Sequence, residues 1–183
     1  MKHTLISILL LPITLIGQVP VDDDSLIYHF DIIINQYRID NDLSPIEINS
    51  NLKDFTEEWS HYLSVINQVT HGSEDISFTK RVDNYDIIPP KSVCVENCGD
   101  AFTPSTPMGE EENVVCSRET LIPYLNKMMK WKCTQKEYAE YIFLLWKSSP
   151  PHDRAMLDPR IHTYFISSSA NSEKTYFSFI GME

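Results

Sequence analysis

The chain has 183 residues, of which 42% are hydrophobic and 11% aromatic, which suits one domain with a real core. Its formal net charge is -11, from 15 basic and 26 acidic side chains, and no basic cluster occurs. An acidic surface repels phosphate, so composition argues against nucleic acid and against an anionic membrane face as partners.

Residues 1–17 have the anatomy of a secretory signal peptide. Met1-Lys2-His3 is a basic start, Thr4 to Ile16 is nearly all apolar, and Gly17 precedes a polar change. The apolar run is shorter than the roughly 20 residues that span a bilayer, and the alternative reading is a buried N-terminal strand. We expect cleavage near Gly17 and a secreted protein, extracellular or periplasmic if bacterial, with no stable membrane span.

Two helices are predicted in the first part of the mature chain. The first begins at the N-cap candidates Asp22 to Ser25 and ends near Asn41-Asp42, and its apolar residues recur at helical spacing. The second begins after Asn49-Ser50 and ends around Thr70-His71-Gly72, with Gly72 as its C-terminal cap. A row of small side chains on this helix predicts the close approach of another element: Thr56, Ser60 and Ser64.

The second half begins with a helical pattern over 121–131, whose methionine-rich apolar face suits core packing or a ligand groove. Thr134 to Glu137 is a capping box that opens an apolar helix over Tyr138 to Trp146. Pro150-Pro151 ends this helix, and a short turn follows from His152 to Leu157. Two strands, Ile161 to Ser168 and Thr175 to Ile180, predict a closing hairpin. The fold class is therefore α+β, with helices packed on a small antiparallel sheet.

The segment 83–116 holds four prolines and little periodicity, which predicts a long loop. In an oxidising compartment the four cysteines predict two disulfides that close this loop, and three pairings are possible. Helix geometry between the last two cysteines favours pairing each of them with one of the first two. A zinc site on the first two is the rival reading. The four residues are Cys94, Cys98, Cys116 and Cys133.

Several short motifs, in this order, resemble the CAP superfamily of cysteine-rich secretory, antigen five and pathogenesis-related proteins. The match covers roughly residues 24–183, and it departs from the family at Asp42 and Glu111, where glycine is usual. The motifs are INQYR from Ile34, LSPIEINSNL from Leu43, His71 in THGS, EEN at Glu111 to Asn113, WKSSPPHDR from Trp146 and FIG from Phe179. The resemblance implies an α-β-α sandwich in a single domain over 24–183.

The resemblance also implies a surface cleft that gathers His71, Glu112 and His152, flanked by Asn113, Ser149 and Trp146. Neutral imidazoles bind zinc or a similar divalent cation, and a neighbouring carboxylate can orient a ring or activate a bound water. Each residue also has a structural reading. His71 suits a helix C-terminus, Glu112 lies in an acidic run, and His152 follows two prolines. The remaining histidines of the mature chain are assigned structural roles: His29, His61 and His162.

Three function classes follow from these residues and from the resemblance. The first is a monomeric, non-enzymatic extracellular binding module for a lipid, a sterol or another small apolar ligand, or for an extracellular protein. The second is a metal-dependent hydrolase or protease that uses the cleft. The third is a structural exported domain with no working cleft. Nucleophilic catalysis is disfavoured, because the sequence contains no Gly-x-Ser-x-Gly elbow.

Overall fold

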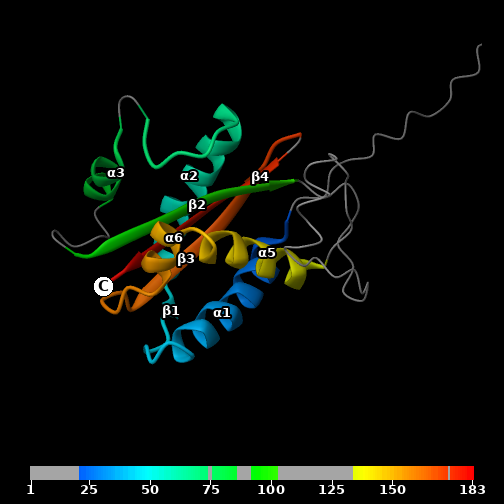
Figure 1. The fold of residues 1–183 in the computed structure, drawn as a ribbon. Coiled ribbons are helices and arrows are strands. Elements are labelled where there is room, and N and C mark those ends of the chain that lie inside the picture. Colours follow the sequence, from blue (N-terminus) through cyan, green and yellow to red (C-terminus); the bar gives the residue numbers. More distant parts are fainter. Residues whose placement is uncertain (1–20, 74–75, 86–91, 103–133, 173) are drawn as a thin grey trace, which may run out of the picture.

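The computed structural model describes residues 21–73, 76–85, 92–102, 134–172 and 174–183. Within these residues a four-stranded sheet has the strand order β1-β3-β4-β2, and helices pack on both of its faces (Figure 1). The helices are α1 (Asp23–Ile39), α2 (Lys53–Ile66, after the 3-10 turn η1, Ser50–Leu52), α3 (Phe78–Asn84), α5 (Gln135–Lys147) and α6 (Pro150–Met156). The strands are β1 (Glu47–Ile48), β2 (Cys94–Phe102), β3 (Thr163–Ala170) and β4 (Lys174–Met182).

The predicted α+β class and the closing hairpin are confirmed. Strands β3 and β4 pair antiparallel from Thr163↔Met182 to Ala170↔Thr175. The sheet is mixed rather than wholly antiparallel, because the short strand β1 pairs parallel with β3. Strand β1 was not predicted, since two residues carry no periodicity.

The predicted long loop over 83–116 is wrong for its described part. Strand β2 pairs antiparallel with β4 along its whole length, from Cys94↔Met182 to Phe102↔Lys174, and forms an edge of the sheet. Helix α3 extends across the start of the predicted loop. Polar residues on both faces of β2 hide its alternation, so backbone pairing with β4 decides its conformation rather than a hydrophobic pattern.

Two predicted helix starts are confirmed by their capping bonds. The Asp22 side chain accepts from the backbone N–H of Asp24, at the start of α1. Thr134 and Glu137 form the capping box of α5. After α1, Asp42 has a φ of 61°, so it adopts the left-handed conformation that glycine adopts most readily.

The predicted end of the second helix is wrong. Helix α2 ends at Ile66, and Asn67 rather than Gly72 is the left-handed C-cap, with a φ of 54°. The Asn67 side chain is held by tertiary contacts, because its Oδ1 accepts from the Tyr176 hydroxyl at 2.6 Å and from the Asn171 amide at 3.1 Å. Residues 67–73 therefore form a loop that carries His71 away from the helix.

The core has two layers, one on each face of the sheet. On one face α1 and α5 pack against alternate residues of β3 and β4, with Phe30, Trp146, Tyr164 and Phe179 in mutual ring contact. On the other face α2 packs against the intervening residues, including Phe165 and Tyr176. The predicted small-residue row lies in this second layer, where Ser60 Oγ is 3.5 Å from Ser167 Oγ and Ser64 Oγ is 3.1 Å from Ser169 Oγ.

Helix α6 is fixed to α1 by two polar side chains. The buried Arg38 donates to the carbonyl of Met156 at 2.7 Å and to that of Asp158 at 3.1 Å. The Tyr37 hydroxyl donates to Asp153 at 2.8 Å, and burial together with this carboxylate raises the pKa of Tyr37 to about 12. These contacts set the position of His152, which lies in the first turn of α6.

Candidate metal centre

The imidazoles of His71 and His152 face each other beside the edge strand β2. Their ring centroids are 5.8 Å apart, and the ring planes meet at 51°. His71 comes from the loop after α2, and its side chain is half-exposed. His152 is half-buried, and its pKa is lowered by burial and by the neighbouring His71. A lowered pKa keeps His152 neutral at neutral pH, which is the form that binds a metal.

Glu96 of β2 is the carboxylate that contacts His71. Its Oε2 lies 2.9 Å from His71 Nδ1, and its side chain is only 2% exposed. When Nδ1 donates to this carboxylate, the lone pair of Nε2 is free to bind a cation. A carboxylate in this position fixes the tautomer and the ring orientation of a metal-binding histidine.

Arg81 of α3 holds the second oxygen of Glu96. Its Nη2 donates to Oε1 at 2.5 Å, and the residue is 8% exposed. The guanidinium carbon also lies 3.4 Å from the centre of the Trp59 ring, and cation–π attraction stabilises the charge there. Both oxygens of Glu96 are thus engaged, which makes it an orienting group.

Asn97, the next residue of β2, contacts the second histidine. Its Nδ2 donates to the backbone carbonyl of His152 at 3.1 Å, and the residue is fully buried. Successive side chains of a strand point to opposite faces. Glu96 therefore lies on the α2 side and Asn97 on the α6 side, and the two histidine segments meet at this edge.

The predicted carboxylate Glu112 and its neighbour Asn113 lie outside the described residues, so their roles stay predictions. The sequence contains a second Glu-Asn pair, Glu96-Asn97, which the loop prediction passed over. That repeated dipeptide is the sequence signal that could have identified Glu96 and Asn97 as site residues. Recognising it required knowing that 94–102 is a strand.

The two flanking residues that the structure describes have different surroundings. Trp146 is fully buried, and its indole N–H donates to the carbonyl of Cys98 at 3.0 Å, so it fastens α5 to β2. Ser149 precedes α6 as its N-cap but makes no capping bond with its side chain. Trp146 is thus part of the core beneath the site, and Ser149 lies at the joint that carries His152.

Cys98 offers a third possible ligand on the α2 side. Its sulfur, a His71 nitrogen and a Glu96 oxygen all lie within 4.8 Å of one another. Burial, followed by the charge of Glu96, raises the pKa of Cys98 well above its usual value. The sulfur is therefore a protonated thiol, which is a weak metal ligand. A metal that bound Cys98 would have to displace this proton, whereas neutral imidazoles bind a metal without losing one.

Cys94 and Cys98, the two described cysteines, form no disulfide with each other. They lie four residues apart on one strand, so their side chains point to the same face. Bridges to Cys116 and Cys133 would involve residues outside the described part of the chain. The two predicted disulfides stay predictions.

Three solved bacterial proteins illustrate the similarity of fold. An outer surface protein from Borrelia burgdorferi superposes with a TM-score of 0.58 at 14% identity, over 91% of this chain and 97% of its own. An extracellular SCP-domain protein from Bacillus anthracis gives 0.55 at 11% identity, over 86% and 41%. A cysteine-rich secretory protein from Staphylococcus aureus gives 0.54 at 16% identity, over 90% and 40%.

This chain thus spans about two fifths of the length of the second and third of these proteins. The sequence itself matches no family model and no curated protein. Among the described helices, none combines the length and the apolar character needed to cross a membrane. Layer order, strand pairing and the structural matches agree, and the described chain has the fold of the SCP domains to which its motifs bear a resemblance.

Proposed function

We propose that this chain is an exported, divergent member of the CAP superfamily that binds a divalent metal at His71 and His152. In this proposal the domain is an extracellular binding module rather than an enzyme. One observation carries the proposal: two imidazoles face each other at the sheet edge, and Glu96 holds the Nδ1 of His71. Export is supported by the leader-like residues 1–17 and by the structural matches, which include an outer surface protein and an extracellular protein.

The chemistry of the site suits zinc or a similar cation. Neutral imidazole nitrogens are common zinc ligands of intermediate softness, and water molecules can complete a tetrahedral coordination shell. Two protein ligands predict modest affinity, because structural zinc sites use four. Affinity should also fall below about pH 6, when imidazoles protonate.

The alternative, a metal-dependent hydrolase, requires a carboxylate that can take a proton from bound water. Glu96 does not suit this role, since one oxygen contacts His71 Nδ1 and the other accepts from Arg81. Among the described residues, the carboxylate beside the histidine pair therefore favours the binding module, while Glu112 stays the predicted base of the alternative. In this proposal the binding of an apolar or protein ligand is independent of the binding of the metal.

Zinc titration by calorimetry tests the metal proposal, using wild type, His71→Ala, His152→Ala and the control His61→Ala. His61 is an exposed histidine of α2, so its loss changes the histidine count without touching the pair. We expect one site in wild type and in His61→Ala, and no measurable binding in the other two variants. Equal binding in all four proteins would refute the site.

Mass spectrometry of the secreted protein tests export. The expected mature chain begins near Gln18. An exported protein that retains Met1 would contradict the proposal.

A further inference from the structure

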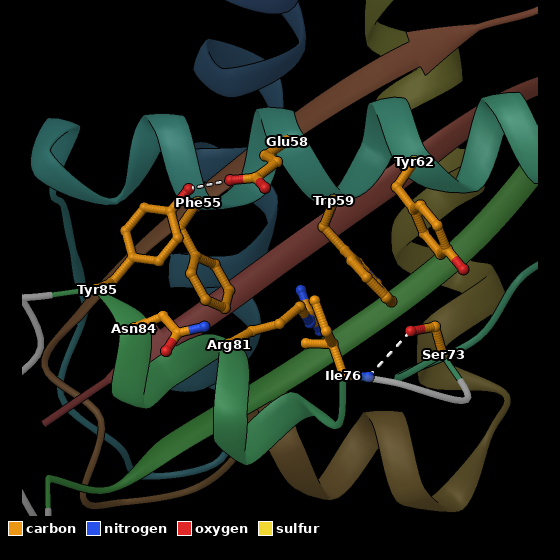
Figure 2. Close-up of a pocket in the computed structure, with 9 residues that line it drawn as sticks. All are labelled: Phe55, Glu58, Trp59, Tyr62, Ser73, Ile76, Arg81, Asn84 and Tyr85. Atoms are coloured by element: carbon orange, nitrogen blue, oxygen red, sulfur yellow. Dashed lines mark hydrogen bonds between the residues drawn. The ribbon is translucent and has the colours of Figure 1, made fainter.

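A pocket separate from the histidine pair lies between α2 and α3, with a volume of about 390 Å³ (Figure 2). Four of its nine lining residues are aromatic, and the lining comes from α2, from α3 and its C-cap, and from the segment before α3. Small-molecule sites typically measure about 300–1,000 Å³ and are apolar with few polar groups. The pocket therefore has the size and lining of a site for a small ligand.

The aromatic walls present flat, fixed surfaces. Trp59 and Tyr62 stack with their centroids 4.7 Å apart and their planes at 21°. Phe55 and Tyr85 meet edge to face at 5.0 Å. Rings that already pack against each other in pairs lose little conformational entropy when a ligand binds. Flat ring faces also favour a flat aromatic ligand.

Arg81 supplies unpaired hydrogen-bond donors in the pocket lining. The residue is 8% exposed, and within the described part of the chain its Nε and Nη1 are buried without an acceptor. Stacking on Trp59 does not satisfy them, because N–H bonds lie in the guanidinium plane and a 3.4 Å separation covers only its face. A buried donor without an acceptor is unfavourable, so a ligand whose acceptor atom reached these two nitrogens would relieve this cost.

The charges around the pocket select against ionic ligands. Glu96 balances the charge of Arg81 from behind, so the buried end already holds a paired cation and anion. Glu58 lies at the exposed side of the pocket, where its carboxylate accepts from the Tyr85 hydroxyl at 2.5 Å. Glu58 and the overall charge of -11 repel an anion, and a cation would have to lie beside Arg81.

We propose that this pocket binds a neutral, flat aromatic molecule whose carbonyl group accepts from Arg81. The ring would lie among Phe55, Trp59, Tyr62 and Tyr85, and a donor on the ligand would face Glu58. A primary aromatic amide has this arrangement of acceptor and donor. The pocket lining contains neither histidine, although Arg81 connects the pocket to the histidine pair through Glu96.

The experiment titrates metal-free protein with benzamide, benzoate and benzylamine, which share one ring and differ in charge. The readout is the indole N–H signal of Trp59 in NMR spectra, assigned through a Trp59→Phe variant. Trp146 serves as an internal reference, because it lies on the opposite face of the sheet. Benzamide should shift the Trp59 signal saturably, leave Trp146 unchanged, and bind at least tenfold more tightly than either charged analogue.

Two variants and one control locate the binding. Tyr62→Ala removes a wall and Ile76→Phe fills the pocket, so each should weaken benzamide binding at least tenfold. Tyr28→Ala removes an exposed tyrosine of α1, 63% exposed, and should bind like wild type. The proposal is overturned by the absence of a saturable shift, by a charged analogue that binds equally well, or by undiminished binding in Ile76→Phe. Zinc titration of the same samples tests the metal proposal independently, so failure of benzamide binding and failure of zinc binding can be told apart.

Discussion

Glu96 and Asn97 are consecutive residues of the edge strand β2, yet they hold different histidine segments on opposite faces of the sheet. Glu96 contacts the ring of His71 at 2.9 Å, and Asn97 donates to the backbone of His152 at 3.1 Å. The two-residue period of a strand separates the two contacts. One short stretch of β2 thus determines the distance between the imidazoles.

Replacing Asn97 with alanine should weaken zinc binding while the fold persists. The change removes the donor that fixes the His152 backbone, and the loss of one such hydrogen bond costs about 1 kcal/mol of unfolding free energy. Outer partners of a metal site typically change affinity by about 10–100-fold. Calorimetry and urea denaturation give the two values. The control is Asn41→Ala, an exposed amide bonded to Tyr37. Wild-type zinc affinity in Asn97→Ala would show that β2 does not position His152.

Replacing Arg81 with methionine should strongly destabilise the protein. It leaves the carboxylate of Glu96, 2% exposed, without its cation, and breaking a buried pair costs about 3–5 kcal/mol. Adding Glu96→Gln should recover part of this loss, because the amide carries no charge. Urea denaturation of both variants measures the difference.

The exposed pair Arg160 and Asp158 is the control for Arg81. The Arg160 side chain is 63% exposed and solvent screens its charge, so Arg160→Met should leave the unfolding free energy close to that of wild type. A similar loss in Arg81→Met and Arg160→Met would contradict the buried-pair interpretation.

Enlarging Ser60 should separate α2 from the sheet. Ser60 is fully buried and its hydroxyl lies 3.5 Å from that of Ser167, so leucine has no space there. Overpacking of this kind costs about 1–3 kcal/mol. Val65 of α2 is 69% exposed, so the control change Val65→Leu should stay within about 0.5 kcal/mol of the wild-type unfolding free energy. Thermal or urea unfolding compares them, and equal stabilities would mean that the serine row tolerates bulk.

The stability of metal-free protein should fall as the pH drops below about 6.5, with His152 as one cause. Burial and His71 lower the pKa of His152 in the folded state from its usual 6.5. The unfolded chain therefore takes up this proton at a higher pH than the folded chain, so acid favours unfolding, and the contribution is complete above pH 6.5. In His152→Asn the slope of unfolding free energy against pH should be smaller in this range. Identical slopes would assign the acid sensitivity to other groups.

Local chemistry was sufficient to predict α1, α5 and the closing hairpin. Capping by Asp22 and Thr134 and the apolar periodicity that follows act within a few residues, so they can be read along the chain. The small-residue row of α2 was also informative, because only small side chains permit the contact that Ser64 makes with Ser169.

Tertiary structure decided the remaining features. Asn67 ends α2, and partners distant in sequence hold its side chain. The sequence around Gly72 carries no information about those partners, so the predicted helix end was misplaced. Strand β2 exists because β4 supplies its backbone hydrogen bonds, and its polar side chains concealed it in the sequence. The sequence by itself determined that two histidines follow helices α2 and α5. Only the pairing of β2 at the sheet edge placed Glu96 beside His71, because a carboxylate's neighbours depend on strand register rather than on distance along the chain.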